Sequence, residues 1–224
     1  MANRSYLFSI DFDRTIKERE KGEKIIGLSE YNYSIPLSYK ILVSQNSKLS
    51  HSINWDYEHP IAIQGDYQKG KEKLFNFLDK LDSMELTNFI FLKEHIVKTK
   101  EFLNNPINNL KNIILECGEI YEMGDDEIEI QNKELYTNEI LGIDREIEEY
   151  KKHCKEWDRK IHVLREGKKD LESPKGLFKK LFSSNSNKKI EKINKTIQTI
   201  EMDILSELGI DYWTNILYFS FENE

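Results

Sequence analysis

Cysteine is scarce in this sequence, and the familiar motifs that hold metals or cofactors are missing. The two cysteines, Cys117 and Cys154, form neither a CxxC pair nor a metal-binding spacing, which argues against a disulfide framework and a zinc site. The five histidines show no HExxH spacing, and no GxGxxG, P-loop or GxSxG motif occurs. The sequence therefore predicts buried free thiols in a reducing compartment, with no cofactor, metal or catalytic site.

Long apolar runs are absent as well. No window reaches the roughly 18 apolar residues that a transmembrane helix requires. The stretch "MANRSYLFSIDFDRT" is too short and too polar for a signal peptide. Four prolines and ten glycines in 224 residues argue against a disordered or collagen-like chain. We expect a folded, cytoplasmic protein.

Charge is plentiful and unevenly placed. The formal net charge is −7, and an acidic protein is repelled by nucleic acid and attracted to basic proteins, although solubility alone also explains an acidic surface. Residues 122–149 carry eleven acidic and two basic side chains, a net of −9. Residues 151–189 carry thirteen basic and five acidic side chains, a net of +8. These opposite blocks predict an electrically polarised molecule.

The N-terminal half predicts a sheet with flanking helices, in an α+β fold of α/β-like appearance. Strands are expected over residues 5–12, 23–29 and 59–67 and from residue 110, where branched and aromatic residues cluster. Helices are expected after Pro36 and over residues 67–81 and 84–103, where apolar residues follow a helical period. The aromatic run over residues 212–224 is expected to return as a strand and rejoin the sheet.

Two heptad patterns predict a long antiparallel helical hairpin. Apolar residues at alternating steps of three and four lie at positions 140, 143, 147, 150, 154, 157, 161 and 164, and a second set lies at 190, 193, 197, 200, 204 and 208. A segment rich in Gly, Pro, Ser and Asn joins them, so the helices are expected to pair and project about 35 Å. The predicted organisation is a globular domain of residues 1–134 plus 210–224 and a hairpin of residues 135–209, with a basic and apolar tip at 167–189.

The tip contains "GLFKKLF", in which Leu177, Phe178, Leu181 and Phe182 form one apolar face of a short helix. Four interpretations fit this face. It caps the end of the hairpin, anchors a protein partner, touches an anionic membrane surface, or mediates self-association.

The segment "SEYNYSIP" crowds Glu30, Tyr31, Asn32 and Tyr33 together before a predicted helix. Tyrosines beside polar groups are typical of protein-recognition surfaces. They are equally typical of a loop whose tyrosines pack on the edge of a sheet, and both interpretations stay open.

The stretch "LFSIDFDRTI" resembles the first motif of haloacid-dehalogenase-type phosphohydrolases. The resemblance implies that Asp11 attacks phosphorus and that Asp13 handles the proton of the leaving group, with magnesium bridging them. Further matches would be Ser44 for the second motif, Lys93 or Lys111 for the third, and Asp125 with Asp126 for the fourth. Against this interpretation, Pro36 and the apolar spacing after it place Ser44 on a helix rather than at the end of a strand.

Four other pieces of the sequence resemble a group of uncharacterised bacterial cytosolic proteins that begin "MANRSYLY". The matching pieces are "MANRSYLF", "LSEYNYSIPL", "IAIQGDY" and "LECGEIYEM". The resemblance covers residues 1 to about 123 and leaves out the predicted hairpin. It implies a shared fold and no particular reaction.

The leading interpretation is a small, acidic antagonist of another protein, similar to the immunity proteins of bacterial toxin systems. It would act by occlusion, since an acidic surface steers a basic toxin domain and a few aromatic side chains anchor it. The residues predicted to steer are Asp125, Asp126, Glu127 and Glu129, and those predicted to make contact are Glu30, Tyr31, Tyr33, Phe178, Leu181 and Phe182. The alternative is the magnesium-dependent phosphohydrolase that uses Asp11 and Asp13.

Overall fold

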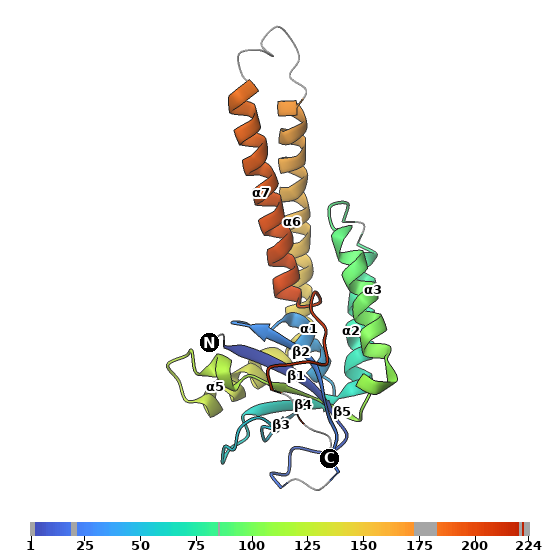
Figure 1. Cartoon of the computed structure of the whole chain (residues 1–224), viewed down its shortest axis with the longest axis vertical. Helices are drawn as coiled ribbons and strands as arrows, with labels where there is room; N and C mark the ends of the chain where they lie inside the picture. The colour runs from blue at the N-terminus through green and yellow to red at the C-terminus, as the bar shows by residue number, and fades with distance from the viewer. Residues whose placement is uncertain (1–2, 19–21, 85, 173–182, 220, 222–224) are drawn as a thin grey trace.

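The computed structural model describes residues 3–18, 22–84, 86–172, 183–219 and 221 (Figure 1). Five strands form one sheet in the order β2-β1-β5-β4-β3, and every neighbouring pair is antiparallel. The strands are β1 (Arg4–Ile10), β2 (Ile25–Asn32), β3 (Lys48–Ser50), β4 (Ala62–Asp66) and β5 (Asn112–Glu116). Four of them were expected from the sequence, whereas β3 is too short to leave a pattern.

The helices carry most of the remaining chain. They are α1 (Leu37–Val43), α2 (Tyr67–Asp82), α3 (Phe91–Asn104), α4 (Gly118–Tyr121), α5 (Ile128–Glu134), α6 (Ile143–Glu172) and α7 (Ser183–Leu208). A 3-10 turn, η1 (Pro106–Asn108), precedes β5, and a π-helical segment, η2 (Leu135–Ile140), precedes α6. Helix α1 begins directly after Pro36, as predicted, because proline presets the backbone for a first helical turn.

Alternation along the strands gives the sheet two different faces. On one face Leu7, Ile63 and Leu115 join a large apolar core with residues of α1, α2, α3, α6 and α7. On the other face Tyr6 and Phe8 belong to a smaller apolar cluster that contains no residue of these helices. These five helices therefore cover one face, and the predicted α+β class is confirmed.

The second face is covered by the C-terminal segment, and the strand predicted there is wrong. Over residues 212–219 and 221, the described part of that run, no strand forms, and the backbone N–H of Thr214 donates to the carbonyl of Leu28 on β2 at 3.0 Å. Leu217 is buried in the smaller cluster, and the Phe219 ring packs edge-on against Tyr6 with 5.2 Å between centroids. The aromatic residues that suggested a strand cover a sheet face instead, since large rings bury much area per residue.

The two long helices α6 and α7 confirm the predicted hairpin (Figure 1). The predicted seam is buried along the described part of the pair, on α6 at Ile143, Ile147, Tyr150, Cys154 and Ile161 and on α7 at Ile197, Ile200, Ile204 and Leu208. A helix of 30 residues extends about 45 Å, so the hairpin projects well beyond the sheet. The connecting residues 173–182, with Phe178, Leu181 and Phe182, lie outside the described residues.

The hairpin is fixed to the α2–α3 connection at and beyond the middle of α6. The backbone N–H of Asn88, in the α2–α3 connection, donates to the Asp158 carboxylate of α6 at 3.0 Å, and Arg165 donates to the Asn88 side chain at 2.6 Å. Within the pair, the Tyr150 hydroxyl donates to the Ile204 carbonyl at 3.0 Å. These contacts join the hairpin to the globular body past the midpoint of α6.

Candidate functional site

One end of the sheet gathers the segments that the sequence singled out. The start of β1 lies beside the end of β2, where Arg4 pairs with Asn32, and beside the end of β5, where Tyr6 pairs with Glu116. The residues that follow β2 and β5 therefore leave the sheet at the same end. They are the tyrosine segment after β2 and, through α4, the acidic residues before α5.

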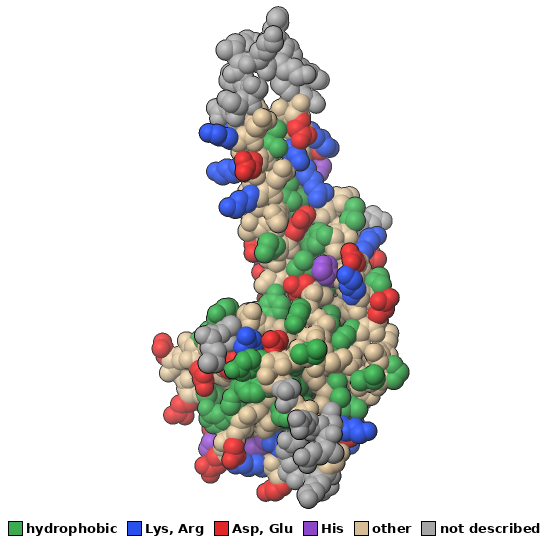
Figure 2. Space-filling model, in the orientation of Figure 1, with side chains coloured by type: hydrophobic (Ala, Val, Ile, Leu, Met, Phe, Trp, Pro, Cys, Tyr) green, Lys and Arg blue, Asp and Glu red, His purple; other side chains and the backbone are tan. Residues whose placement is uncertain are grey.

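The acidic loop, residues 122–129, is exposed at this end. The carboxylates of Asp125, Asp126, Glu127 and Glu129 all belong to exposed residues, and in Figure 2 acidic side chains line the α5 side of the sheet domain. His59 lies 3.8 Å from Glu129, which is an ion pair only when the imidazole is protonated. The structure therefore presents the predicted steering residues to solvent, as the proposed role requires.

The loop is held in shape from beneath. The side-chain amide of Gln131 donates to the carbonyls of Tyr121 and Asp126, at 2.9 and 2.6 Å. The Tyr121 hydroxyl in turn donates to the Asn132 side chain at 2.9 Å. The backbone that carries these carboxylates is thus fixed to α4 and α5. A fixed loop loses less conformational entropy when its carboxylates bind a partner.

The tyrosine pocket lies between β2 and the chain that follows α7. Its lining residues are Glu30, Tyr31, Asn32, Ser206, Asp211 and Tyr212. Tyr31 is half-buried and hydrogen-bonded to Ser206; burial raises the pKa of its hydroxyl, an effect that the Asp211 carboxylate adds to and Ser206 opposes. Tyr33, beside the pocket, is 61% exposed. The packing interpretation fits Tyr31, which is half-buried, and the recognition interpretation fits Tyr33, which faces solvent.

Beside the pocket, the positively charged side chain of Arg4 lies between a carboxylate and an aromatic ring. The Arg4 guanidinium lies 3.4 Å from the Glu30 carboxylate and 4.9 Å from the centre of the Tyr218 ring. The backbone N–H of Tyr218 donates to Glu30 at 2.7 Å. Carboxylate and ring together stabilise the positive charge.

The sequence analysis missed half of this pocket. Tyr212 comes from the aromatic run that was assigned to a strand, and Asp211 directly precedes that run, about 180 residues after Tyr31. The signal in the sequence was the density of aromatic residues in that run. In the structure two of them remain accessible to a partner, since Tyr212 is 49% and Tyr218 is 56% exposed.

A known protein family matches the part of the chain that contains the acidic loop and the β2 wall of the pocket. Residues 14–156 match the domain of unknown function DUF7822, which is more than half of the chain. The chain belongs to the DUF7822 family. The match includes β2, the acidic loop and the first half of α6, and it leaves out α7, Asp211 and Tyr212. No curated protein and no solved structure matches the chain.

Membership of the DUF7822 family agrees with the resemblance to an uncharacterised family and adds no reaction to it. Among the described residues, no helix is long and apolar enough to span a membrane. Within the same residues, no group of three His, Cys, Asp or Glu side chains is placed to hold a metal ion.

The Asp pair of the phosphohydrolase motif is occupied with local contacts in this DUF7822 protein. Asp11 accepts a hydrogen bond from the backbone N–H of Lys24 at 2.8 Å, and Asp13 accepts one from that of Thr15 at 2.9 Å. Ser44 caps the end of α1 and donates to the carbonyl of Ile41. The two aspartates thus stabilise turns around β1, and the hydrolase interpretation stays a prediction.

Both thiols of the DUF7822 chain are free and buried. Burial raises the pKa of Cys154 to about 12 and raises that of Cys117 further. A thiol that stays protonated is a poor nucleophile. The cysteines therefore serve the core, as the sequence predicted.

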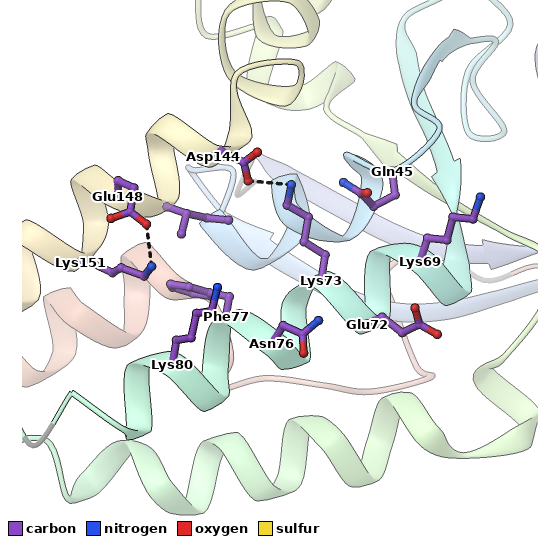
Figure 3. Close-up of a pocket in the computed structure, with 11 residues that line it drawn as sticks. Gln45, Lys69, Glu72, Lys73, Asn76, Phe77, Lys80, Asp144, Glu148 and Lys151 are labelled. Atoms are coloured by element: carbon purple, nitrogen blue, oxygen red, sulfur yellow. Dashed lines mark hydrogen bonds and ion pairs between the residues drawn. The ribbon is translucent and has the colours of Figure 1, made fainter.

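A groove at the base of the hairpin is rich in charge (Figure 3). Lys73 of α2 reaches Asp144 of α6 at 2.8 Å, and Lys151 lies 2.7 Å from Glu148 on α6 itself. The first ion pair joins α2 to the hairpin, and in the second Glu148 neutralises the charge of Lys151. This groove is accordingly a structural junction.

Glu116 of β5 is a fully buried acid. Its side chain is fully buried on the second face of the sheet, where it accepts hydrogen bonds from Ser52 at 2.8 Å and from the backbone N–H of Ile53 at 2.6 Å. Burial raises the pKa of the carboxyl to about 7, against these hydrogen bonds and the charge of Arg14, which lower it. Both oxygens are engaged, so Glu116 holds the 50–56 connection on the sheet.

Glu116 makes the stability of the protein depend on pH. The folded state binds the proton more tightly than the unfolded state, so the free energy of unfolding should fall by about 3 kcal/mol as pH rises from about 4.5 to about 7. Glu116→Gln should remove that part of the pH dependence, as measured by urea unfolding at several pH values. The matched control is Glu101→Gln, an exposed carboxylate of α3, which should keep the wild-type slope. An unchanged slope in Glu116→Gln would contradict the assignment.

Proposed function

We propose that this protein is a cytoplasmic, protein-binding antagonist of the immunity type, which neutralises a toxin by covering it. The observation that carries the proposal is the meeting of exposed carboxylates and exposed tyrosines at one end of the sheet. Asp125 and Asp126 on the acidic loop supply negative charge, and Tyr33 and Tyr212 supply large rings. The partner that fits such a surface is a basic protein domain.

The proposed mechanism divides the work between the two features. Exposed carboxylates attract a basic partner over several ångströms and raise the rate of encounter. Tyrosine rings then exclude water from the contact and slow dissociation, because aromatic side chains dominate the energetics of interfaces. No chemical step is required, since a covered active site is an inactive one.

The rigidity of the surface supports the same proposal. Gln131 fixes the acidic loop, and the carbonyl of Tyr212 accepts a hydrogen bond from Ser29 of β2 at 2.5 Å. A surface that does not reorganise loses less entropy when it binds. Solubility alone would not require carboxylates to be held in one arrangement.

The test is survival of bacterial cells that express the open reading frame directly upstream of this gene, with and without the protein. Immunity genes commonly lie beside their toxin genes, so we expect that frame to kill and this protein to rescue. Purified proteins should then form a one-to-one complex in size-exclusion chromatography. A harmless frame, or one that kills in the presence of this protein, would contradict the proposal.

A further inference from the structure

The residues that line the tyrosine pocket are of the kinds that bind a positively charged group. The pocket is a hollow of about 520 Å³ whose lining contains Glu30, Asp211, Tyr31 and Tyr212, and among the described residues no lysine or arginine lines it. Tyrosine faces are electron-rich and attract cations, most strongly when a carboxylate lies nearby. The lining is therefore selective in charge, and its rings suit a long side chain with an apolar stem.

The end of α7 adds to this negative field. Ser206 lies in the last turn of this 26-residue helix, so the carbonyl end of the helix dipole adjoins the pocket and favours positive charge there. Asp203 and Glu207 lie on the same final turns. The nearby basic side chain, Arg4, is already paired with Glu30.

Asp211 is the group left to receive a ligand. Its carboxylate is exposed and has no hydrogen bond or ion pair among the described residues. The backbone on both sides of it is fixed, since Ile210 is buried and the Tyr212 carbonyl accepts from Ser29. Asp211 and Tyr212 therefore line the pocket on a backbone that is already fixed before any ligand arrives.

The geometry around Arg4 shows how a cation sits on this surface. Its guanidinium lies against the Glu30 carboxylate and over the Tyr218 ring. Asp211 and Tyr212 offer the same two kinds of group, a carboxylate and a tyrosine ring, and no lysine or arginine of the described residues is paired with either.

We propose that the tyrosine pocket receives a lysine or arginine side chain of the protein partner, held between Asp211 and the Tyr212 ring. The identity of the partner rests on the proposed function, whereas the chemistry of the ligand rests on the pocket alone. The inserted side chain would anchor the complex, while the acidic loop steers it.

The experiment uses three matched probes on the full chain: Nα-acetyl-arginine amide, Nα-acetyl-lysine amide and the uncharged Nα-acetyl-norleucine amide. Backbone amide shifts are followed by NMR at constant ionic strength. We expect the two cations to bind with dissociation constants on the order of millimolar and to shift Asn32, Ser206 and Tyr212. Norleucine should bind at least about 5-fold more weakly. Equal binding of norleucine, or shifts outside the pocket, would overturn the proposal.

Two substitutions test the assigned groups. Asp211→Asn and Tyr212→Leu should each weaken arginine amide binding by about 3- to 10-fold, which is the range expected for one carboxylate or one ring near a cation. The control Glu101→Gln, which removes one exposed carboxylate from α3, should bind the probe as wild type does. If the control weakens binding as much as Asp211→Asn, overall charge explains the result and the pocket assignment is wrong.

The outcomes separate the pocket from the proposed function. Probe binding in the pocket together with failed rescue of the toxic frame would leave the cation site standing and remove the immunity role. Rescue of the toxic frame together with no probe binding would support the immunity role and remove the cation site.

Discussion

Gly70→Ala should strongly lower the free energy of unfolding of this protein. Gly70 lies in the first turns of α2, where the helix crosses the end of α1, and an ideal Cβ there would lie 1.9 Å from the carbonyl oxygen of Leu42. A contact with backbone cannot be relieved by rotating a side chain, so α2 must move away from α1 and open the core between them. We expect a loss of about 3–5 kcal/mol in the free energy of unfolding, measured by urea denaturation.

The matched control is the same change at Gly167 in α6. A Cβ at that position meets no atom within 4 Å, so only the helix propensity changes. Gly167→Ala should therefore stabilise the protein by up to about 1 kcal/mol. A Gly70→Ala variant within 1 kcal/mol of wild type would mean that α2 and α1 are not in the contact described.

Reversing the charge of the acidic loop should abolish protection by this protein in the rescue assay. Asp125→Lys combined with Asp126→Lys replaces two exposed carboxylates with ammonium groups at the surface that faces the proposed basic partner. Electrostatic steering changes association rates by about 10- to 1000-fold, and like charges across an interface oppose docking directly. We expect the association rate with the purified toxin, measured by stopped flow, to fall within that range.

The control must change the net charge equally without touching the loop. Glu94→Lys combined with Glu101→Lys does so on α3, where both residues are exposed and lie across the molecule from α5 in Figure 1. This variant should associate at nearly the wild-type rate at 150 mM salt, where fields from distant charges are screened within about 8 Å. Equal losses in the two variants would point to overall charge, and no loss in either would remove the acidic loop from the interface.

The hairpin could be predicted from the sequence because its information is local. A heptad pattern states which face of each helix is apolar, and two such helices joined by a short polar connection have one simple way to bury both faces. Trp157 and Ile193, predicted for the seam, pack as expected against the buried core. The sheet was also largely predictable, since four of its strands alternate or concentrate branched residues.

The pocket could not be predicted in the same way, because its two walls are far apart in the chain. Nothing in "SEYNYSIP" indicates that Asp211 and Tyr212 will lie against it. The aromatic run near the C-terminus fits either a strand or the cover of a sheet face, and only the open second face decides between them. Tyr33 adds a backbone feature that no pattern reveals, with a φ of +61° that turns the chain out of β2.

The cover of the second sheet face also sets an order of events at the ribosome. Tyr6 and Phe8 are made early, β5 ends at Glu116, and Leu217 follows 101 residues later. At about 5–20 residues per second, the sheet waits about 5–20 s for its cover. During this interval the nascent chain exposes aromatic side chains of this face to solvent. Because transiently exposed apolar surface is what chaperones bind, the newly made protein should depend on them more than the finished fold does.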